Sequence, residues 1–389
     1  MVSINQKKLN LSLKINTRVL LAYFCFLGLN IIYYWYFTRN WECYASNPKC
    51  GEVFYHVLIG DAMKAYIRQL AVMFNEGWIA LNPGHTISYI YYFLAQIFRF
   101  KIENIFFVAF LVNNISVVIS YVFFVRIGRE IIGLNMRYRW LYFLNPMLIF
   151  SSQMISKEFL LYALTVMIAY YSLVSHNRIY RQPIVFLFTL LITALVRFPI
   201  LALMSTRFFI KENQVRIKRL IFVCLALLIY NGFRLSTTNF EDDFLLNRSP
   251  GLAMNALIYN QYYLGSLIMA PAKIFANFYD LILSLFTPLE NGRFNLYTIS
   301  TIPLVIVFLA QYRSIFYILR HPVLSLKGPL GPLLAFVIVF LIIVSGNIYI
   351  HSRYLWPIMP LLILVLIGIR VKILDIRVSK LTKNIVKNQ

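Results

Sequence analysis

The most regular feature of the chain is a series of long apolar runs separated by short polar segments. Several runs approach the roughly 20 residues that an α-helix needs to cross a bilayer. The pattern predicts an all-α fold, a polytopic membrane helical bundle of about ten transmembrane spans (roughly 8–12). No internal repeat or soluble second domain is found, so residues 1–389 are expected to form a single transmembrane domain. The clearest runs cover approximately residues 19–37, 86–98, 105–125, 159–174, 183–201, 220–235, 296–310, 330–344 and 354–369.

Two longer segments between runs, 39–85 and 236–295, are expected to form external loops. The first contains an amphipathic helix that opens with Asp61, because apolar residues recur there at roughly helical spacing. An Asn-Pro-Gly-His turn at 82–85 ends this region before the next apolar run. The second loop holds an apolar part, 270–289, that lies in the interface or re-enters the membrane. The Asp61 carboxylate is therefore expected at the membrane surface, at the mouth of the bundle.

Composition confirms the class that the runs indicate. Hydrophobic residues make up 60% of the chain and charged residues 13%. In a soluble domain, about half of the residues are apolar and about a quarter are charged. The net charge is +23, yet the basic residues cluster at both ends of the chain and in loops beside apolar runs. This is the positive-inside pattern, which predicts that both termini are cytoplasmic. The charge therefore reports topology, and no nucleic acid is expected as a partner.

Simple counting of spans and the charge rule disagree over residues 126–182. Arg99 and Lys101 end the second run and are expected on the cytoplasmic side. Counting then places Arg126 and the basic residues that follow it outside, whereas their charge favours the inside. Either the segment 140–156 is broken at Asn145-Pro146 and does not fully cross, or external arginines bind phosphate. The sequence leaves both explanations open.

Two acids and a lysine are the first candidates for chemistry. Asp61 is placed to accept a proton from an attacking hydroxyl as a general base; alternatively, it is a solvated helix charge paired with a neighbouring cation. Lys157-Glu158 stands between two apolar runs after the Asn145-Pro146 break. A charged pair at such a place is costly in lipid unless it is paired or hydrated. The pair is therefore a functional candidate, or else an ordinary loop between spans.

Further candidates are cations and polar groups that suit a phosphate-bearing substrate. Arg197 interrupts an apolar run before Phe-Pro, where a guanidinium can fork onto phosphate oxygens or simply snorkel to the interface. His351, Arg353 and Tyr354 open the last run at its expected outer end, and alternatively serve as an aromatic-belt anchor. Glu290, in the second external loop, is a second acid or a loop charge. No CxxC or His/Cys spacing indicates a zinc site, and no cofactor is expected.

The chain contains no Walker loop and no GxGxxG motif that opens a soluble βαβ unit. Chemistry driven by a nucleotide in the cytoplasm is therefore not indicated. An activated donor has to arrive by another route, and a lipid-linked donor suits a bundle embedded in a membrane.

Several of these motifs carry a resemblance to known enzymes. Asp61 with Tyr66, followed by Asn-Pro-Gly-His and a span, resembles the first external loop of integral-membrane glycosyltransferases of the GT-C class. The Asn145-Pro146 break with Lys157-Glu158, the Arg197-Phe198-Pro199 interruption and the closing Arg353-Tyr354 with Pro357 and Pro360 resemble bacterial O-antigen and capsular polysaccharide polymerases (Wzy-type). The resemblance covers most of the chain as scattered short motifs. It implies a multi-pass enzyme of the bacterial inner (cytoplasmic) membrane that acts at the periplasmic face. The lone Asp61, where metal-dependent relatives have paired acids, leaves the need for a divalent metal undecided.

The leading hypothesis is a polymerase that joins polyprenyl-pyrophosphate-linked repeat units into O-antigen or a related surface polysaccharide. Asp61 or Glu158 would act as base on the acceptor hydroxyl, and Arg197, Arg353 and Lys157 would neutralise the departing pyrophosphate. Expected partners are the lipid-linked donor and acceptor glycans, membrane lipids and a chain-length regulator. One alternative is a GT-C enzyme that adds a single sugar from polyprenyl monophosphate. Another is a flippase or transporter of lipid-linked glycan, although transporters more often show inverted repeats and ions near the bilayer midplane.

Overall fold

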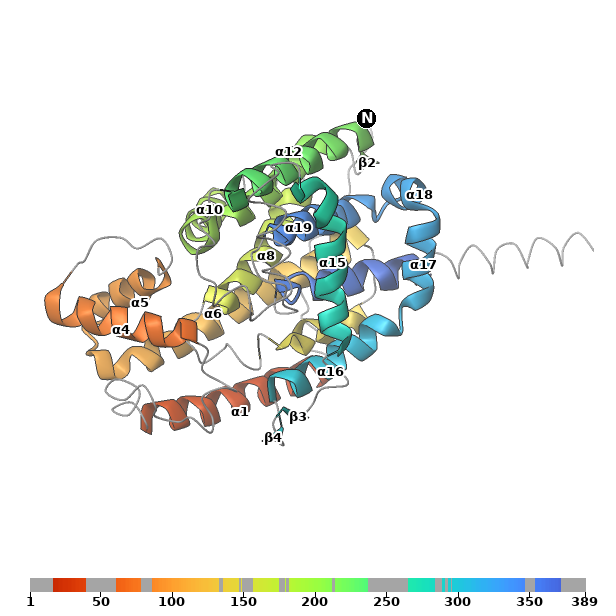
Figure 1. Cartoon of the computed structure of the whole chain (residues 1–389). Helices are drawn as coiled ribbons and strands as arrows, with labels where there is room; N and C mark the ends of the chain where they lie inside the picture. Colours follow the sequence, from red (N-terminus) through yellow and green to blue (C-terminus); the bar gives the residue numbers. More distant parts are fainter. Residues whose placement is uncertain are drawn as a thin grey trace, which may run out of the picture.

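The fold of the chain is helical, as a computed structural model shows (Figure 1). Strands within the described residues are limited to two antiparallel hairpins, β1 (Ile210–Lys211) with β2 (Gln214–Val215) and β3 (Leu289–Glu290) with β4 (Arg293–Phe294). The expected all-α class is confirmed for this part of the chain. The structure describes residues 17–39, 61–77, 86–132, 136–146, 148, 157–174, 179, 182–211, 214–236, 265–283, 289–290, 293–294, 296–346 and 354–371.

Helix boundaries follow the apolar runs of the sequence closely. The helices that coincide with predicted runs are α1 (Thr17–Arg39), α5 (Thr86–Ile97), α6 (Ile105–Arg126), α8 (Lys157–Leu173), α10 (Pro183–Arg197), α12 (Ile217–Ser236), α16 (Leu296–Leu309), α19 (Gly331–Ser345) and an unlabelled last helix, Met359–Val371. Other helical elements are α4 (Asp61–Glu76), α11 (Thr206–Phe209), α15 (Gly265–Leu283), α17 (Tyr312–Arg320), α18 (Pro322–Lys327), the 3₁₀ segments η2 (Ile102–Asn104), η4 (Met136–Leu144) and η5 (Phe198–Ser205), and the π-helical η3 (Ile127–Ile132).

The apolar helices are compatible with a membrane protein. By length and composition, two helical stretches of the described residues are long and apolar enough to cross a bilayer, Ile102–Glu130 and Pro183–Phe209, although the second is interrupted at Arg197. A third arises if Thr301–Leu309 and Tyr312–Arg320, which are bent by 55°, form one span. Apolar side chains such as Ile184, at 80% exposed, lie on the outside of the bundle, where only lipid would cover them favourably. The total of about ten spans stays a prediction.

Helix α8 forms the centre of the bundle, and every side chain from Phe159 to Leu173 is buried. Helices α6, α10 and α19 and the 3₁₀ segment η5 pack around it. Helices α8 and α19 and the last helix contribute most of the larger buried cluster. A smaller cluster joins α4 and α5 to the start of α6. Figure 1 shows α4 and α5 gathered at one end of the molecule, beyond α8 and α10.

One end of the bundle collects the arginines that the sequence places in cytoplasmic loops. Arg207 follows η5, and its Nη1 donates hydrogen bonds to the carbonyls of Tyr171 and Val174 (3.4 Å for Val174) at the end of α8. Arg219 donates from Nη1 to the carbonyl of Phe208 at 3.2 Å. Strand β2 packs against α18 and α19. We call this the basic end, defined by Arg126, Arg207, Arg216, Arg219 and Lys327.

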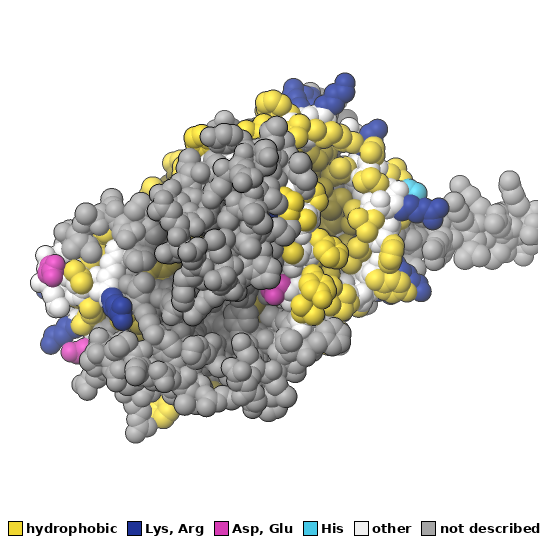
Figure 2. All heavy atoms as spheres, in the orientation of Figure 1, with side chains coloured by type: hydrophobic (Ala, Val, Ile, Leu, Met, Phe, Trp, Pro, Cys, Tyr) yellow, Lys and Arg dark blue, Asp and Glu magenta, His cyan; other side chains and the backbone are white. Residues whose placement is uncertain are grey.

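The surface agrees with this assignment. Figure 2 shows Lys and Arg side chains along the start of α12 and along α17 and α18, whereas the end with α4 and α5 shows both signs of charge. Exposed residues at that opposite end are Arg68, Glu76, Arg99, Lys101 and Glu103. The charge asymmetry between the ends is the one that positive-inside sorting produces.

The helix Ile102–Glu130 settles how the disputed segment is arranged within the bundle. The guanidinium of Arg126 lies 5.9 Å from the centroid of the Tyr170 ring, so this helix finishes at the basic end beside Arg207. Its 29 residues would span about 43 Å, which puts Arg99 and Lys101 at the opposite end. Arg99 and Lys101 therefore lie opposite Arg126, as counting of spans predicts. The charge rule cannot hold for both ends, so the two predicted cytoplasmic positions, Lys101 and the Arg207 loop, cannot both be right.

The apolar segment Pro183–Phe209 turns back on itself at Arg197. Gln182, just before the segment, lies against Tyr171, whose hydroxyl is 3.5 Å from the Gln182 Oε1 atom. Arg207, near its other end, hydrogen-bonds the carbonyl of the same tyrosine. The Arg197 backbone is extended, at φ −161 and ψ 89, and separates α10 from η5. The segment therefore forms a helical hairpin that starts and finishes at the basic end.

Candidate functional site

The apex of this hairpin is the first component of the candidate site. Helix α10 has 15 residues, so Arg197 lies about 22 Å from the basic end. Its side chain is half-buried, and its guanidinium lies 5.7 Å from the centroid of the Tyr354 ring. A cation over an aromatic face is attracted by the ring quadrupole. This contact joins two sequence-predicted site residues that are far apart in the chain.

A second contact brings the Asn145-Pro146 break to the same segment as Tyr354. The Asn145 side chain is fully buried, and its Nδ2 donates a 2.7 Å hydrogen bond to the carbonyl of Trp356. Because Trp356 is two residues from Tyr354, the break and the Arg197 apex meet at one short stretch of chain. We call Asn145, Arg197, Tyr354 and Trp356 the Arg197 junction.

The local sequence explains why chain breaks coincide here. Pro146 follows Asn145, and the residue before a proline is biased away from the helical conformation, which suits the end of η4 at Leu144. Pro199 stands at the start of η5, where a missing N–H is tolerated. The helix therefore ends at each break, and the polar side chain there, Asn145 or Arg197, contacts a neighbouring segment.

Lys157, the first residue of α8, lies at the same level of the bundle as the Arg197 junction. The end of α8 contacts Arg207 at the basic end, so its first residue lies at the other extremity of this helix. Leu160, Leu164 and Val196 belong to one buried cluster, which places the start of α8 beside the end of α10. The Lys157 side chain is half-buried. The structure thus brings Lys157, Arg197 and Tyr354 to one level of the bundle.

Asp61 is the first residue of α4, as the amphipathic pattern predicts. Helix α4 buries Tyr66 and Leu70 and exposes Arg68 and Glu76. Its buried face shares a cluster with Val196, the residue before Arg197. The helix therefore packs over the half of the bundle that contains the Arg197 junction. The Asp61 side chain lies outside what the structure describes, so its role as the general base stays a prediction.

The remaining predicted site residues are not tested by the structure. Glu158 is the second residue of α8, and its side chain lies outside the described part. His351 and Arg353 fall within 347–353, which is also outside it. Glu290 is in β3 and pairs in register with Arg293 of β4. The side chains of this pair are not described either.

Lys273 is a buried cation that the sequence reasoning missed. It lies in the middle of α15 and is only 3% exposed, on a buried stripe of that helix with Asn277 and Leu281. Asn277 donates from Nδ2 to the Lys273 carbonyl at 2.8 Å. The available signal was a single lysine within the apolar part of the second external loop, because a buried charge in a membrane bundle indicates function by default.

Among the residues that the structure describes, no three His, Cys, Asp or Glu side chains gather closely enough to hold a metal ion. The described polar groups of the Arg197 junction are instead a guanidinium, a phenol ring, an amide and backbone carbonyls. A guanidinium suits the oxygens of a phosphate or carboxylate and does not suit a cation.

The comparisons with known proteins do not indicate which chemistry the site performs. The chain matches no known protein family, and no curated protein or solved structure is significantly similar to it. The resemblance to GT-C enzymes and O-antigen polymerases therefore stays an expectation that rests on the motifs of the sequence.

Proposed function

We propose that the protein is a membrane-embedded glycosyltransferase that polymerises polyprenyl-pyrophosphate-linked repeat units of a surface polysaccharide. The observation that supports this best is the Arg197 junction: a half-buried guanidinium at a hairpin apex, stacked on Tyr354 and beside the Asn145–Trp356 contact. An ionisable side chain among the apolar helices of a membrane bundle is a functional-site candidate by default. The pyrophosphate of a lipid-linked glycan is an anion that reaches such a site within the membrane.

In the proposed reaction, a hydroxyl oxygen of the acceptor glycan attacks the anomeric carbon of the donor sugar. The hydroxyl proton passes to a carboxylate, either Asp61 or Glu158. The bond between the anomeric carbon and the phosphate oxygen breaks, and the polyprenyl pyrophosphate leaves with the electron pair. Arg197, with Lys157 and Arg353, stabilises the negative charge that develops on the leaving group.

The proposed site lies away from the basic end, which suits chemistry on the outer side of the bacterial inner membrane. If the positive-inside bias sets the orientation, the basic end faces the cytoplasm. The Arg197 junction then opens toward the periplasm, where the lipid-linked repeat units are expected. Both termini would be cytoplasmic, and the last described helix supports this, because its Arg370 Nη1 lies 3.5 Å from the Ala310 carbonyl at the turn before α17.

The test is deletion of the gene and complementation with wild-type, Arg197→Ala and Arg197→Lys proteins, followed by gel analysis of surface-polysaccharide length. Arg197→Ala is expected to reduce long-chain product by about 100-fold or more, the usual effect of removing one group that stabilises developing charge. Arg197→Lys retains the charge without the planar fork and should give an intermediate ladder. Protein abundance in the membrane is measured by immunoblot for each variant.

Arg320→Ala is the matched control, because Arg320 is an exposed arginine at the basic end; it should leave the ladder unchanged. An unaltered ladder in the deletion strain contradicts the polymerase. Loss of one sugar, with the ladder otherwise intact, would identify a single-sugar GT-C transferase. Retention of complete repeat units on the cytoplasmic leaflet would identify a transporter of lipid-linked glycan.

A further inference from the structure

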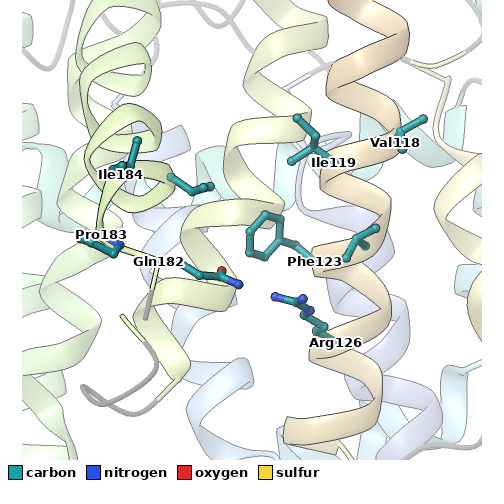
Figure 3. A pocket seen from close by; sticks show the side chains of 9 residues that line it. Val118, Ile119, Phe123, Arg126, Gln182, Pro183 and Ile184 are labelled. Atoms are coloured by element: carbon teal, nitrogen blue, oxygen red, sulfur yellow. The ribbon is translucent and has the colours of Figure 1, made fainter. Parts of the chain in front are cut away.

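A groove opens between α6 and the start of α10, close to the basic end (Figure 3). Its volume is about 530 Å³, within the range of roughly 300–1,000 Å³ typical of ligand pockets. The walls are aliphatic and face outward, with Ile184 80% and Val118 49% exposed. The groove is thus a channel on the lipid-facing surface. Its aliphatic walls are Val118, Ile119 and Val122 of α6 and Pro183, Ile184 and Val185 of α10.

One end of this groove is polar. Arg126 and Gln182 line it there, and Figure 3 shows their head groups directed toward each other across the space between the helices. The Arg126 guanidinium lies 5.7 Å from the Phe123 ring centroid and 5.9 Å from that of Tyr170. These rings attract the cation on its faces and leave its N–H edges available for an acceptor.

Charge complementarity identifies the missing partner as an anion. No ion pair joins Arg126 to a carboxylate among the residues that the structure describes. Other groups nearby on this helix are Arg129 and Glu130, both exposed, which leaves a net positive charge at the polar end. A guanidinium at the mouth of an apolar channel forms charge-assisted hydrogen bonds to a phosphate while the channel takes a hydrocarbon chain.

We infer that this groove binds an anionic phospholipid, with the phosphate on Arg126 and Gln182 and one acyl chain along the aliphatic walls. Basic pockets between membrane helices on the cytoplasmic side commonly bind such head groups. The groove is separate from the Arg197 junction, since the two lie at opposite ends of α10, about 22 Å apart for its 15 residues. The inference does not depend on glycosyl transfer.

The lipid holds α6 and α10 together at their basic ends. Phe123, which lines the groove, packs against Tyr171 at 5.3 Å between ring centroids, and Tyr171 contacts both Gln182 and Arg207. Occupancy of the groove therefore stabilises the two ends of the hairpin whose apex is Arg197. A phospholipid bound here links the composition of the inner leaflet to the stability of the hairpin.

The test uses the purified full-length protein in detergent, with native mass spectrometry and thermal unfolding as readouts. Phosphatidylglycerol is titrated against phosphatidylcholine of the same acyl composition. Wild type should retain phosphatidylglycerol and unfold at a higher temperature with it, because a ligand that binds only the folded state stabilises that state. Arg126→Ala should weaken phosphatidylglycerol binding about tenfold or more, and Val122→Trp, which fills the channel, should weaken it with the charge intact.

Arg320→Ala is again the matched control, since it removes a basic-end charge outside the groove; it should bind as wild type does. Equal losses in Arg126→Ala and Arg320→Ala would show non-specific attraction to the basic end and overturn the inference. Equal retention of the two phospholipids by wild type would overturn it as well. So would undecaprenyl monophosphate displacing phosphatidylglycerol at lower concentration, because the groove would then hold a prenyl lipid. If Arg126→Ala does not fold, Arg126→Lys and Val122→Trp decide the result.

Discussion

Single polar side chains determine how the segments of this bundle meet. Asn145 is fully buried, and its 2.7 Å hydrogen bond to the Trp356 carbonyl joins residues that are 211 positions apart in the chain. The same carbonyl also accepts a backbone hydrogen bond from the Met359 N–H at 3.3 Å, so the amide adds one hydrogen bond, worth about 0.5–1.5 kcal/mol. This amide therefore helps to fix the position of Tyr354, and with it the stacking of Arg197.

Replacing Asn145 by Ala is expected to reduce the free energy of unfolding by about 0.5–1.5 kcal/mol, because it removes one buried hydrogen bond while the Trp356 carbonyl keeps the Met359 N–H as a donor. Polymer length should fall as well, since Tyr354 would no longer be held beside Arg197. Thermal unfolding in detergent and the complementation ladder measure the two effects.

Asn114→Ala is the comparison for this variant. Asn114 also donates from Nδ2, at 2.8 Å, but its acceptor is the Phe110 carbonyl one turn earlier on the same helix. Removing this hydrogen bond breaks no contact between distant segments, so the stability and the polymer length should stay close to those of wild type. An equal effect of both substitutions would mean that Asn145 acts only locally.

Sequence reasoning found residues of the site where a polar group interrupts an apolar run. Arg197 is of this kind, and the structure places it in contact with Tyr354, which opens the last predicted run. Lys273 escaped attention because its run was assigned to an external loop, although α15 buries it. The Asn145–Trp356 contact could not be inferred, since nothing local in either segment specifies a partner so far along the chain.

At the scale of elements, apolar runs predicted helix positions well, because hydrophobic length and helix length are set by the same requirement to satisfy backbone groups in lipid. The apolar runs did not predict the path of the chain through the bundle equally well. The run at 183–201 was expected to cross the membrane, whereas both ends of Pro183–Phe209 lie against Tyr171. Reversal at Arg197 depends on the extended backbone of Arg197 itself, two residues before Pro199, and on packing against α8. The apolar content of the run predicts neither feature.

This hairpin predicts a short distance between spin labels at Ile184→Cys and Phe208→Cys, both at exposed positions, in a protein whose four native cysteines are replaced. Neighbouring helices pack about 8–10 Å apart, so pulsed electron paramagnetic resonance should give roughly 20 Å with the label linkers. A straight helix would separate these positions by about 36 Å.

The helix Ile102–Glu130 supplies the reference for a path without reversal. Labels at Glu103→Cys and Arg129→Cys, exposed positions near its two ends, should lie about 39 Å apart. If both pairs give long distances, α10 and η5 form one continuous span and the Arg197 apex does not exist.

At the scale of the whole molecule, charge is divided between the two ends of the bundle. The basic end carries the arginines of three chain regions, and the opposite end carries α4, α5 and both signs of charge (Figure 2). The Arg197 junction lies on the side of the bundle away from the basic end. Orientation in the membrane therefore decides which compartment the proposed site faces. Because Arg99 and Lys101 lie opposite Arg126, the charge rule cannot place both groups on the cytoplasmic side, and the orientation has to be measured.

Membrane-impermeant maleimide applied to intact spheroplasts determines the orientation. With the native cysteines replaced, Glu103→Cys at the opposite end should react, and Lys327→Cys at the basic end should react only after permeabilisation. The reason is that Lys and Arg in short loops are retained on the cytoplasmic side, while scattered charges such as those of Arg99 and Lys101 are outnumbered. The reverse labelling would turn the Arg197 junction toward the cytoplasm, away from any periplasmic acceptor, and polymerisation at the outer face would have to be abandoned even if Arg197 proved essential.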